Sequence, residues 1–244
     1  MSFLTTIFYQ VLYRPLFNGL VFLYNIIPGH DFGIAIIILT ILIRLLLYPL
    51  FQKSIKSQQE LSLLQPKIKE VQQKYKNDKE KQARAMMDLY KEHKVNPMSG
   101  CLPLLIQLPL LIAFFRVLIT GLDPSKLSFL YWFVQNPIKI NPMFLGIVDL
   151  AKANYPLAIL TGIVQFFQSK MLAPKNSSSG GSDFASAMST QMVYMMPILT
   201  VIIALKMPAG LPLYWTTLNL FGIIQQYYTS RGTTQKKTQN NAEK

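Results

Sequence analysis

The most restrictive feature of the sequence is residues 32–51, FGIAIIILTILIRLLLYPLF, an aliphatic run that contains one charge, Arg44. A helix that crosses a bilayer needs about 20 consecutive apolar residues, so this run predicts a transmembrane helix. An Arg near the centre of such a helix costs about 2.5–3.5 kcal/mol on insertion scales. Because Leu would be less unfavourable at this position, Arg44 is a candidate functional residue.

The composition indicates a membrane protein with several spans rather than one or two soluble domains. Of the 244 residues, 51% are hydrophobic, and the mean hydropathy is +0.28. The single Cys excludes a disulfide framework and a thiolate metal site. The two His fit no metal-binding pattern, and the sequence has neither a phosphate-binding loop nor a nucleophile elbow. We therefore expect no enzymatic activity and no cofactor.

Five apolar runs predict an all-α membrane protein with five transmembrane helices. The second run contains two Pro, which free backbone carbonyls that neighbouring helices or water must satisfy. The predicted spans are residues 31–52, 97–118, 153–171, 185–205 and 211–229. They are joined by a loop with an aromatic belt at residues 119–152, a polar loop at 172–184 and a turn at 206–210, and residues 230–244 are expected to be a basic, disordered tail.

Residues 1–30 are expected to form an amphipathic helix that lies in the membrane interface. Their polar residues fall within about 80° of one another around a helix, and the opposite side is aromatic and aliphatic. Pro15 predicts a break in this helix, and Asp31 is a candidate N-cap for the first span. An additional spanning helix is the alternative. The polar residues are Gln10, Arg14, Asn18 and Asn25.

Residues 53–96 carry 11 of the 24 Lys and Arg and predict an antiparallel helical hairpin. Apolar residues recur at spacings of three and four in both halves. Pro66 predicts a kink or a new helix, and Asn77 with Glu80 resembles a capping box. A solvated charged loop is the alternative, but it does not explain the apolar spacing. The apolar faces are Leu61, Leu64, Ile68, Val71 and Tyr75 in the first half, and Ala83, Met86, Met87 and Tyr90 in the second.

The distribution of basic residues predicts the orientation of the chain. The side that holds the hairpin, the stretch after the third span and the tail carries 17 of the 24 Lys and Arg, whereas the other side carries 6. Cytoplasmic loops have an excess of Lys and Arg. We therefore expect the hairpin and the C-terminus in the cytoplasm and the helix of residues 1–30 on the outer face.

Arg44 has no acidic partner at the same predicted depth, because every Asp and Glu lies in a loop. An unpaired buried cation is very costly, so we hypothesise that polar side chains of several spans line a wet cavity around Arg44, open to the cytoplasm. The alternative is that Arg44 extends along its helix to the lipid headgroups. The candidate lining residues are Thr40, Gln107, Gln165, Tyr214, Trp215 and Asn219.

Three segments resemble the YidC family of membrane protein insertases, which includes the mitochondrial Oxa and chloroplast Albino proteins. They are FGIAIIILTILIRLLLYPL at 32–50, the stretch at 64–115 that includes KVNPMSGCLPLLIQLP, and MPAGLPLYWTTLNLFGIIQQYY at 207–228. With the order of the spans, the resemblance covers residues 30–230. The chain looks like the short form typical of Gram-positive bacteria, without the large extracytoplasmic domain of Gram-negative members.

The resemblance implies five helices around a hydrophilic groove that is open to the cytoplasm and the lipid. Arg44 matches the single Arg of that groove, and Gln107, Gln165, Tyr214 and Trp215 match groove or client-contacting positions. The implied partners are nascent membrane proteins and the lipid bilayer, with the Sec translocon and the ribosome as further partners. No sequence-specific nucleic-acid binding is implied, and the implied location is the bacterial plasma membrane.

Two other functions stay open at this point. A small-anion transporter would use Arg44 as an anion site, although the five spans contain no inverted repeat. A second possibility is an assembly factor that assists folding without inserting its clients. The implied mechanism for an insertase is that the groove shortens the apolar path and Arg44 attracts acidic residues of the client.

Overall fold

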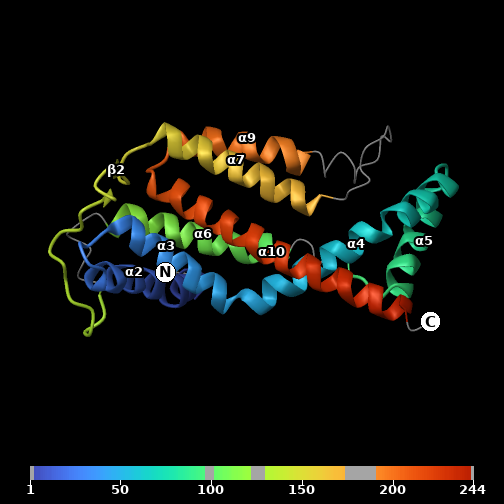
Figure 1. Ribbon diagram of the computed structural model, residues 1–244, viewed down its shortest axis with the longest axis horizontal. Helices are drawn as coiled ribbons and strands as arrows, with labels where there is room; N and C mark the ends of the chain where they lie inside the picture. Colours follow the sequence, from blue (N-terminus) through green and yellow to red (C-terminus); the bar gives the residue numbers. More distant parts are fainter. Residues whose placement is uncertain (1–2, 97–101, 122–129, 174–190, 243–244) are drawn as a thin grey trace.

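The longest described helix, α10 (Gly210–Ala242), lies at the centre of the molecule and packs against α3, α4, α6 and α7. The computed structural model describes residues 3–96, 102–121, 130–173 and 191–242. In Figure 1, α7 and α9 lie side by side above α10, and α2, α3 and α6 lie below it. The pair α4 and α5 extends away from this body toward the C-terminal end of α10.

The N-terminal segment is helical throughout its described part, but its helix type changes before Pro15. A π-helix, η1 (Phe8–Tyr13), connects α1 (Phe3–Ile7) to α2 (Arg14–Ile26), and Pro15 lies in the first turn of α2. Because Pro has no backbone N–H, it is tolerated in a first helical turn. The backbone is therefore not broken at Pro15; the change from π-helix to α-helix occurs just before it.

The polar stripe of the N-terminal helix contacts another part of the protein. Asn18 is buried; its Oδ1 accepts a hydrogen bond from the backbone N–H of Tyr131 at 2.5 Å, and Asn25 Nδ2 donates to the Gln135 carbonyl at 2.6 Å. The Arg14 guanidinium lies 4.7 Å from the centre of the Tyr131 ring. At these positions the polar face predicted for the interface instead holds the connection between α6 and α7.

The predicted first span is two helices in the structure. Its first part, α3 (Phe32–Leu46), begins at the predicted N-cap, where Asp31 Oδ1 accepts a 2.8 Å hydrogen bond from the Ile34 N–H. The chain then bends by 68° at Leu47 and continues as α4 (Tyr48–Lys74). Pro49 explains the break, since it cannot donate to the carbonyl four residues earlier. The range 31–52 predicted for the first span therefore contains α3, the bend and the first residues of α4.

Within the described ranges, no helix taken singly is long and apolar enough to cross a membrane. The bent pair α3 and α4 meets both criteria when the two helices are taken together.

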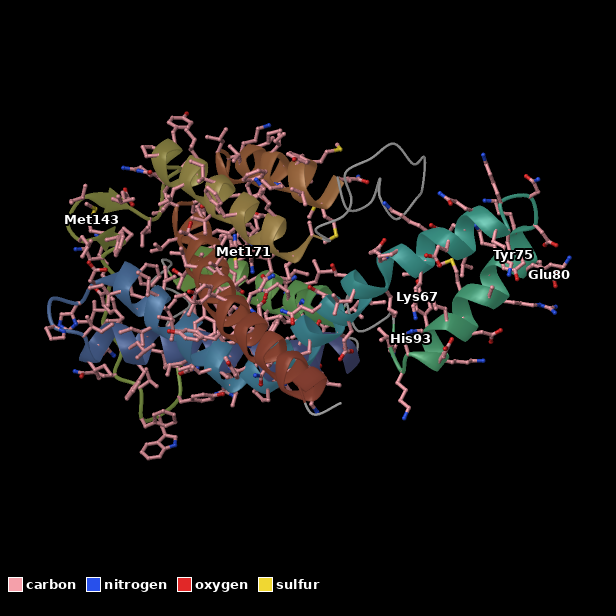
Figure 2. The ribbon with its side chains drawn as sticks, turned by 45° about the vertical axis from the view of Figure 1, so that its right-hand side comes forward. Lys67, Tyr75, Glu80, His93, Met143 and Met171 are labelled. Carbon is pink, nitrogen blue, oxygen red and sulfur yellow. The ribbon has the colours of Figure 1, made fainter. Side chains whose placement is uncertain are left out.

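In the range 53–96, α4 packs against α5 (Lys79–Glu92), so the two charged helices form a hairpin. Its small core consists of buried apolar residues from both helices and the turn that follows. At the open end of the hairpin, Lys67 Nζ donates a 2.9 Å hydrogen bond to His93 Nε2, and the two side chains face each other in Figure 2. The core residues are Leu64, Ile68, Leu89 and Val95, with Leu61, Val71, Met86 and Tyr90 packed around them.

Three details of the hairpin prediction differ in the structure. No new helix begins at Pro66, which lies inside α4 and is exposed, so the lost backbone bond lies on the solvent side. The N-cap of α5 is Asp78 rather than Asn77, because Asp78 Oδ1 accepts from the Lys81 N–H at 3.0 Å. The buried face of α5 differs in part from the predicted one: Met86 and Tyr90 pack against the core as predicted, but Ala83 and Met87 are exposed and Leu89 is buried.

The remaining described helices overlap the ranges predicted for the other four spans, and α10 continues beyond its range. The segments 97–101 and 185–190 lie outside the described residues. Pro109 lies inside α6 without ending it, and the predicted disordered tail is helical in α10 as far as Ala242. Extension of an existing helix adds one hydrogen bond per residue and needs no new nucleus. These helices are α6 (Leu102–Gly121), α7 (Tyr155–Leu172), the π-helix η4 (Gln191–Met195) and α9 (Met196–Ala204), in addition to α10.

A short β-hairpin that was not predicted packs against the N-terminal end of α3. Its strands, β1 (Met143–Phe144) and β2 (Val148–Asp149), pair antiparallel through a turn in which Leu145 and Gly146 have positive φ. Asp31 Oδ2 accepts a 2.5 Å hydrogen bond from the Leu145 N–H. One carboxylate thus begins α3 and also holds the β-hairpin against it.

Candidate functional site

Arg44 lies in the last turn of α3 and is buried, with 7% of its surface exposed. Its guanidinium carbon is 4.1 Å from the centre of the Phe51 ring, which lies on α4 beyond the bend. The Arg44 Nε atom is buried and makes no hydrogen bond. In the described part of the chain, Arg44 forms no ion pair with an Asp or Glu. The Arg44 guanidinium therefore packs against the aromatic face of Phe51, and its Nε–H donor is not used.

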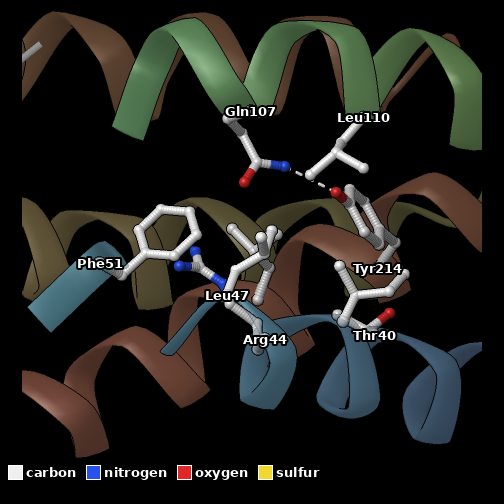
Figure 3. Close-up of a pocket in the computed structure, with 9 residues that line it drawn as sticks. Thr40, Arg44, Leu47, Phe51, Gln107, Leu110 and Tyr214 are labelled. Carbon is white, nitrogen blue, oxygen red and sulfur yellow. Dashed lines mark hydrogen bonds between the residues drawn. The ribbon is translucent and has the colours of Figure 1, made fainter. Parts of the chain in front are cut away.

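A pocket surrounds this guanidinium at the place where α3, α4, α6 and α10 meet (Figure 3). The free space is small: the cavity has a volume of about 10 Å³. That is close to the minimum for one ordered water. Four of the predicted site residues line it, namely Thr40, Arg44, Gln107 and Tyr214. The complete lining is Thr40, Ile43, Arg44, Leu47, Phe51, Gln107, Leu110, Tyr214 and Leu218.

The polar groups opposite Arg44 bond to each other or to their own helix. Gln107 Nε2 on α6 donates a 2.6 Å hydrogen bond to the Tyr214 hydroxyl on α10, as the dashed line in Figure 3 shows. The Tyr214 ring stacks on Phe114, with the ring centres 4.1 Å apart. The Thr40 hydroxyl donates to the Ile36 carbonyl at 2.7 Å. None of these groups is a formal anion, so the positive charge of Arg44 is not neutralised by them.

Three of the predicted residues do not line this pocket. Gln165 is half-buried on α7, and Asn219 is buried on α10. Trp215 is half-buried and packs against the main hydrophobic core. Polar contacts between α7 and α10 are made by other residues, among them the Thr161 and Thr216 hydroxyls, 2.8 Å apart, and Gln226 Nε2, which donates a 2.7 Å hydrogen bond to the Met171 carbonyl.

Residues 22–237 match the model of a family described as 60Kd inner membrane protein. This chain belongs to that family. A relative named "Membrane protein insertase YidC" from Fusobacterium nucleatum subsp. nucleatum is 42% identical over 219 residues, which are 89% of this chain and 96% of the relative.

Longer relatives with the same printed name match only over part of their length. The protein from Geotalea daltonii is 36% identical over 225 residues, and the protein from Syntrophus aciditrophicus is 37% identical over 219 residues. The chain spans 38% and 36% of these two relatives, and 91% and 89% of its own length is matched. The pocket around Arg44 lies within the part that matches the 60Kd inner membrane protein family.

Two residues near the Arg44 pocket were not predicted from the sequence. Phe51 lies seven residues after Arg44, and only the bend at Leu47 brings its ring over the guanidinium. Gln225 on α10 is buried, and its Nε2 donates a 3.1 Å hydrogen bond to the Tyr48 carbonyl in the first turn of α4. Gln225 could have been selected as a polar residue in an apolar run. Its partner, the Tyr48 carbonyl, could not have been predicted, because its position depends on the bend at Leu47.

The chemistry available at this site is attraction of an anion. A guanidinium presents planar donors that match a carboxylate. In the part of the chain that the structure describes, no group of three or more His, Cys, Asp or Glu could hold a metal ion. Arg44 therefore offers donors for a carboxylate, but the free space beside it holds no more than about one water molecule, so a carboxylate would have to displace a lining side chain.

Proposed function

We propose that this chain is a membrane protein insertase that inserts and helps to fold integral membrane proteins. The observation that carries the proposal is the buried Arg44, which has no acidic partner among the described residues and lies between helices α3, α6 and α10. Membership of the 60Kd inner membrane protein family supports it, as does the printed name of the relatives, "Membrane protein insertase YidC".

The proposed arrangement in the membrane has five spans in a bacterial plasma membrane. They correspond to α3 with the start of α4, to α6, to α7, to η4 with α9, and to the first part of α10. The hairpin of α4 and α5 and the C-terminus lie in the cytoplasm, because 17 of the 24 Lys and Arg fall on that side. The N-terminal helices lie on the outer face.

The proposed mechanism needs no covalent step and no nucleotide. A client's polar extracytoplasmic segment enters a hydrophilic groove that contains Arg44, Thr40, Gln107 and Tyr214, and Arg44 transiently attracts its acidic residues. The client's apolar helix then moves sideways past α3, α7 and α10 into lipid, driven by burial of its apolar surface. Because the free space around Arg44 is narrow, α3, α6 and α10 must separate to admit the client. Gln165 and Trp215 are proposed to contact the client along this path.

Insertion by the reconstituted chain tests this proposal. The chain is placed in liposomes with a one-span client whose short tail carries either two Asp or two Asn. Arg44→Ala is expected to reduce insertion of the Asp client about ten-fold, corresponding to about 1.4 kcal/mol for the loss of one charge-assisted contact. Arg44→Lys is expected to retain most of the activity, because it keeps the positive charge.

Arg116→Ala is the matched control. It removes another Arg that lies over a ring, 5.4 Å from the centre of Phe8, but it does not line the Arg44 pocket. It is expected to leave insertion unchanged. Equal insertion of the Asp client by the parent chain and Arg44→Ala would contradict attraction by charge. Uptake of small anions into the same liposomes would favour a transporter, and an absence of insertion by the chain alone would favour an assembly factor.

A further inference from the structure

Phe51 connects the Arg44 pocket to the hairpin. Its ring covers the Arg44 guanidinium at 4.1 Å and is itself buried, with 6% of its surface exposed. In Figure 3 the Phe51 side chain projects from the beginning of α4 toward Arg44 on α3. The two residues lie on opposite sides of the 68° bend at Leu47. The contact between Arg44 and Phe51 therefore ties two helices that meet at an angle.

The contact is of a kind that an acidic side chain can displace. An aromatic face attracts a guanidinium through its quadrupole, whereas a carboxylate offers a full negative charge and two acceptors for its N–H groups. The buried Arg44 Nε has no hydrogen-bond partner while the ring is in place. A carboxylate bound at Arg44 would thus gain hydrogen bonds that Phe51 cannot provide.

Displacement of the ring has to be accommodated by α4. Phe51 lies in the first turn of α4, one turn after the bend, in a pocket with little free space. Leu47 has φ −89° and ψ 2°, outside the helical region; its N–H donates to the Ile43 carbonyl of α3, and its carbonyl accepts from the Phe51 N–H of α4. A change in these two torsions would therefore turn α4 relative to α3. Two hydrogen bonds also link α4 to α10, one from Gln225 Nε2 to the Tyr48 carbonyl and one of 2.6 Å from Gln59 Nε2 to Ser230 Oγ, so a movement of α4 would have to break or carry them.

We propose that Phe51 covers Arg44 when no anion is bound, and that an acidic side chain of a client displaces its ring and moves α4 about Leu47. This inference rests on the proposed insertase function. The hairpin follows the movement, because α5 packs on α4 through the buried residues Leu64, Ile68 and Leu89. Phe51 is accordingly a positioning residue that couples occupation of the Arg44 pocket to the position of the cytoplasmic hairpin.

A distance measurement in the full chain tests the coupling. Spin labels are attached at Met87 on α5 and Leu160 on α7, both exposed in the structure, in a Cys101→Ser background. The distance distribution is recorded in liposomes with a one-span peptide whose tail carries two Asp, and with the same peptide carrying two Asn. The parent protein is expected to show a shift with the Asp peptide and no shift with the Asn peptide.

Three variants decide the role of the Phe51 ring. Phe51→Leu keeps an apolar side chain but removes the aromatic face, so the two peptides are expected to give the same distribution. Phe51→Tyr keeps the face and is expected to retain the shift. Phe8→Leu is the matched control, because it removes the ring from the Arg116 contact and is expected to respond like the parent protein.

The outcomes that overturn the coupling differ from those that overturn the insertase function. A shift in Phe51→Leu equal to that of the parent, or a shift that persists in Arg44→Ala, overturns the role of Phe51. Insertion that depends on Arg44 while the distance stays unchanged also overturns the coupling, but it leaves the insertase proposal intact. Insertion that is indifferent to Arg44→Ala overturns the proposed capture of acidic residues, whatever the labels report.

Discussion

Gln107 on α6 and Tyr214 on α10 are joined by a 2.6 Å hydrogen bond from the amide Nε2 to the phenolic oxygen. The two residues are 107 positions apart, and their bond forms the wall of the pocket opposite Arg44. The ring of Tyr214 is also stacked on Phe114. This contact sets the spacing of α6 and α10 beside the only charge in the pocket lining.

A double-mutant cycle on this pair is expected to show a small favourable coupling. Gln107→Leu and Tyr214→Phe each remove one partner, and interhelical hydrogen bonds in membrane proteins average about 0.6 kcal/mol. The double variant should therefore be less destabilised than the sum of the single variants by about that amount. Reversible unfolding in detergent micelles measures it, and strictly additive effects would show that the bond does not contribute to stability.

Gly33→Ala is expected to destabilise the protein by about 1–3 kcal/mol, the usual range for overpacking. A Cβ at this position would lie 2.1 Å from Cδ2 of Phe144, so the ring of β1 would have to move. The measurement is the thermal unfolding midpoint. Phe144→Ala is the control background: Gly33→Ala added to it should have little further effect, and an unchanged penalty there would exclude the ring as the cause.

Asp31 variants are expected to separate its two roles. Asp31→Ala loses the α3 cap and the bond to the Leu145 N–H, and loss of an N-cap costs about 1 kcal/mol. Asp31→Asn keeps one carbonyl oxygen for the Ile34 N–H but has no second oxygen for Leu145. Hydrogen exchange should therefore be faster at Leu145 in both variants and faster at Ile34 only in Asp31→Ala. Equal exchange at both amides in the two variants would contradict this division.

The start of α5 is expected to depend on pH through Asp78. A hydrogen bond from the Lys81 backbone N–H, and then one from its side chain, lowers the pKa of Asp78 below its ordinary value. Because the pKa is lower in the folded state, the stabilisation is present above the unfolded pKa and is lost as the pH falls through the folded pKa. Amides in the first turn of α5 should lose protection from exchange over that acidic range.

Asp78→Ala is the comparison for that experiment. It removes the titrating group, so exchange in the first turn of α5, corrected for the intrinsic rate, should be faster at neutral pH and should not change further on acidification. The amides of α7, which begins at the Asn154 cap, serve as the internal reference, because Asn does not titrate. A parallel loss of protection in α7 would assign the effect to global unfolding.

Local patterns in the sequence were sufficient for several parts of the fold. The cap at Asp31 and the facing stripes of the hairpin, including Leu64 and Ile68, depend on spacings of three and four residues within one helix. The buried face of α5 was predicted only in part, because Ala83 and Met87 are as compatible with the helical period as Leu89. The position of α4 relative to α5 decides which of these faces is buried.

The candidate site was predictable only in part for the same reason. A charge in an aliphatic run and polar residues in other apolar runs identify Arg44, Thr40, Gln107 and Tyr214, and the structure brings these four to one pocket. Gln165 and Trp215 satisfied the same pattern, yet they do not line it. A polar residue in a spanning run must find a partner, but the sequence does not name the helix face that provides one.

Composition and periodicity by themselves determined that the chain is helical and apolar, that a paired charged hairpin follows the first long apolar run, and that Arg44 lacks an acidic partner in its own run. The tertiary structure alone decided the 68° bend at Leu47, the contact of Phe51 with Arg44 and the attachment of β1 and β2 to Asp31. The physical reason is the distance along the chain over which the interactions act. Helix formation and capping depend on neighbours within about four residues, whereas the surroundings of a buried cation depend on how distant helices pack.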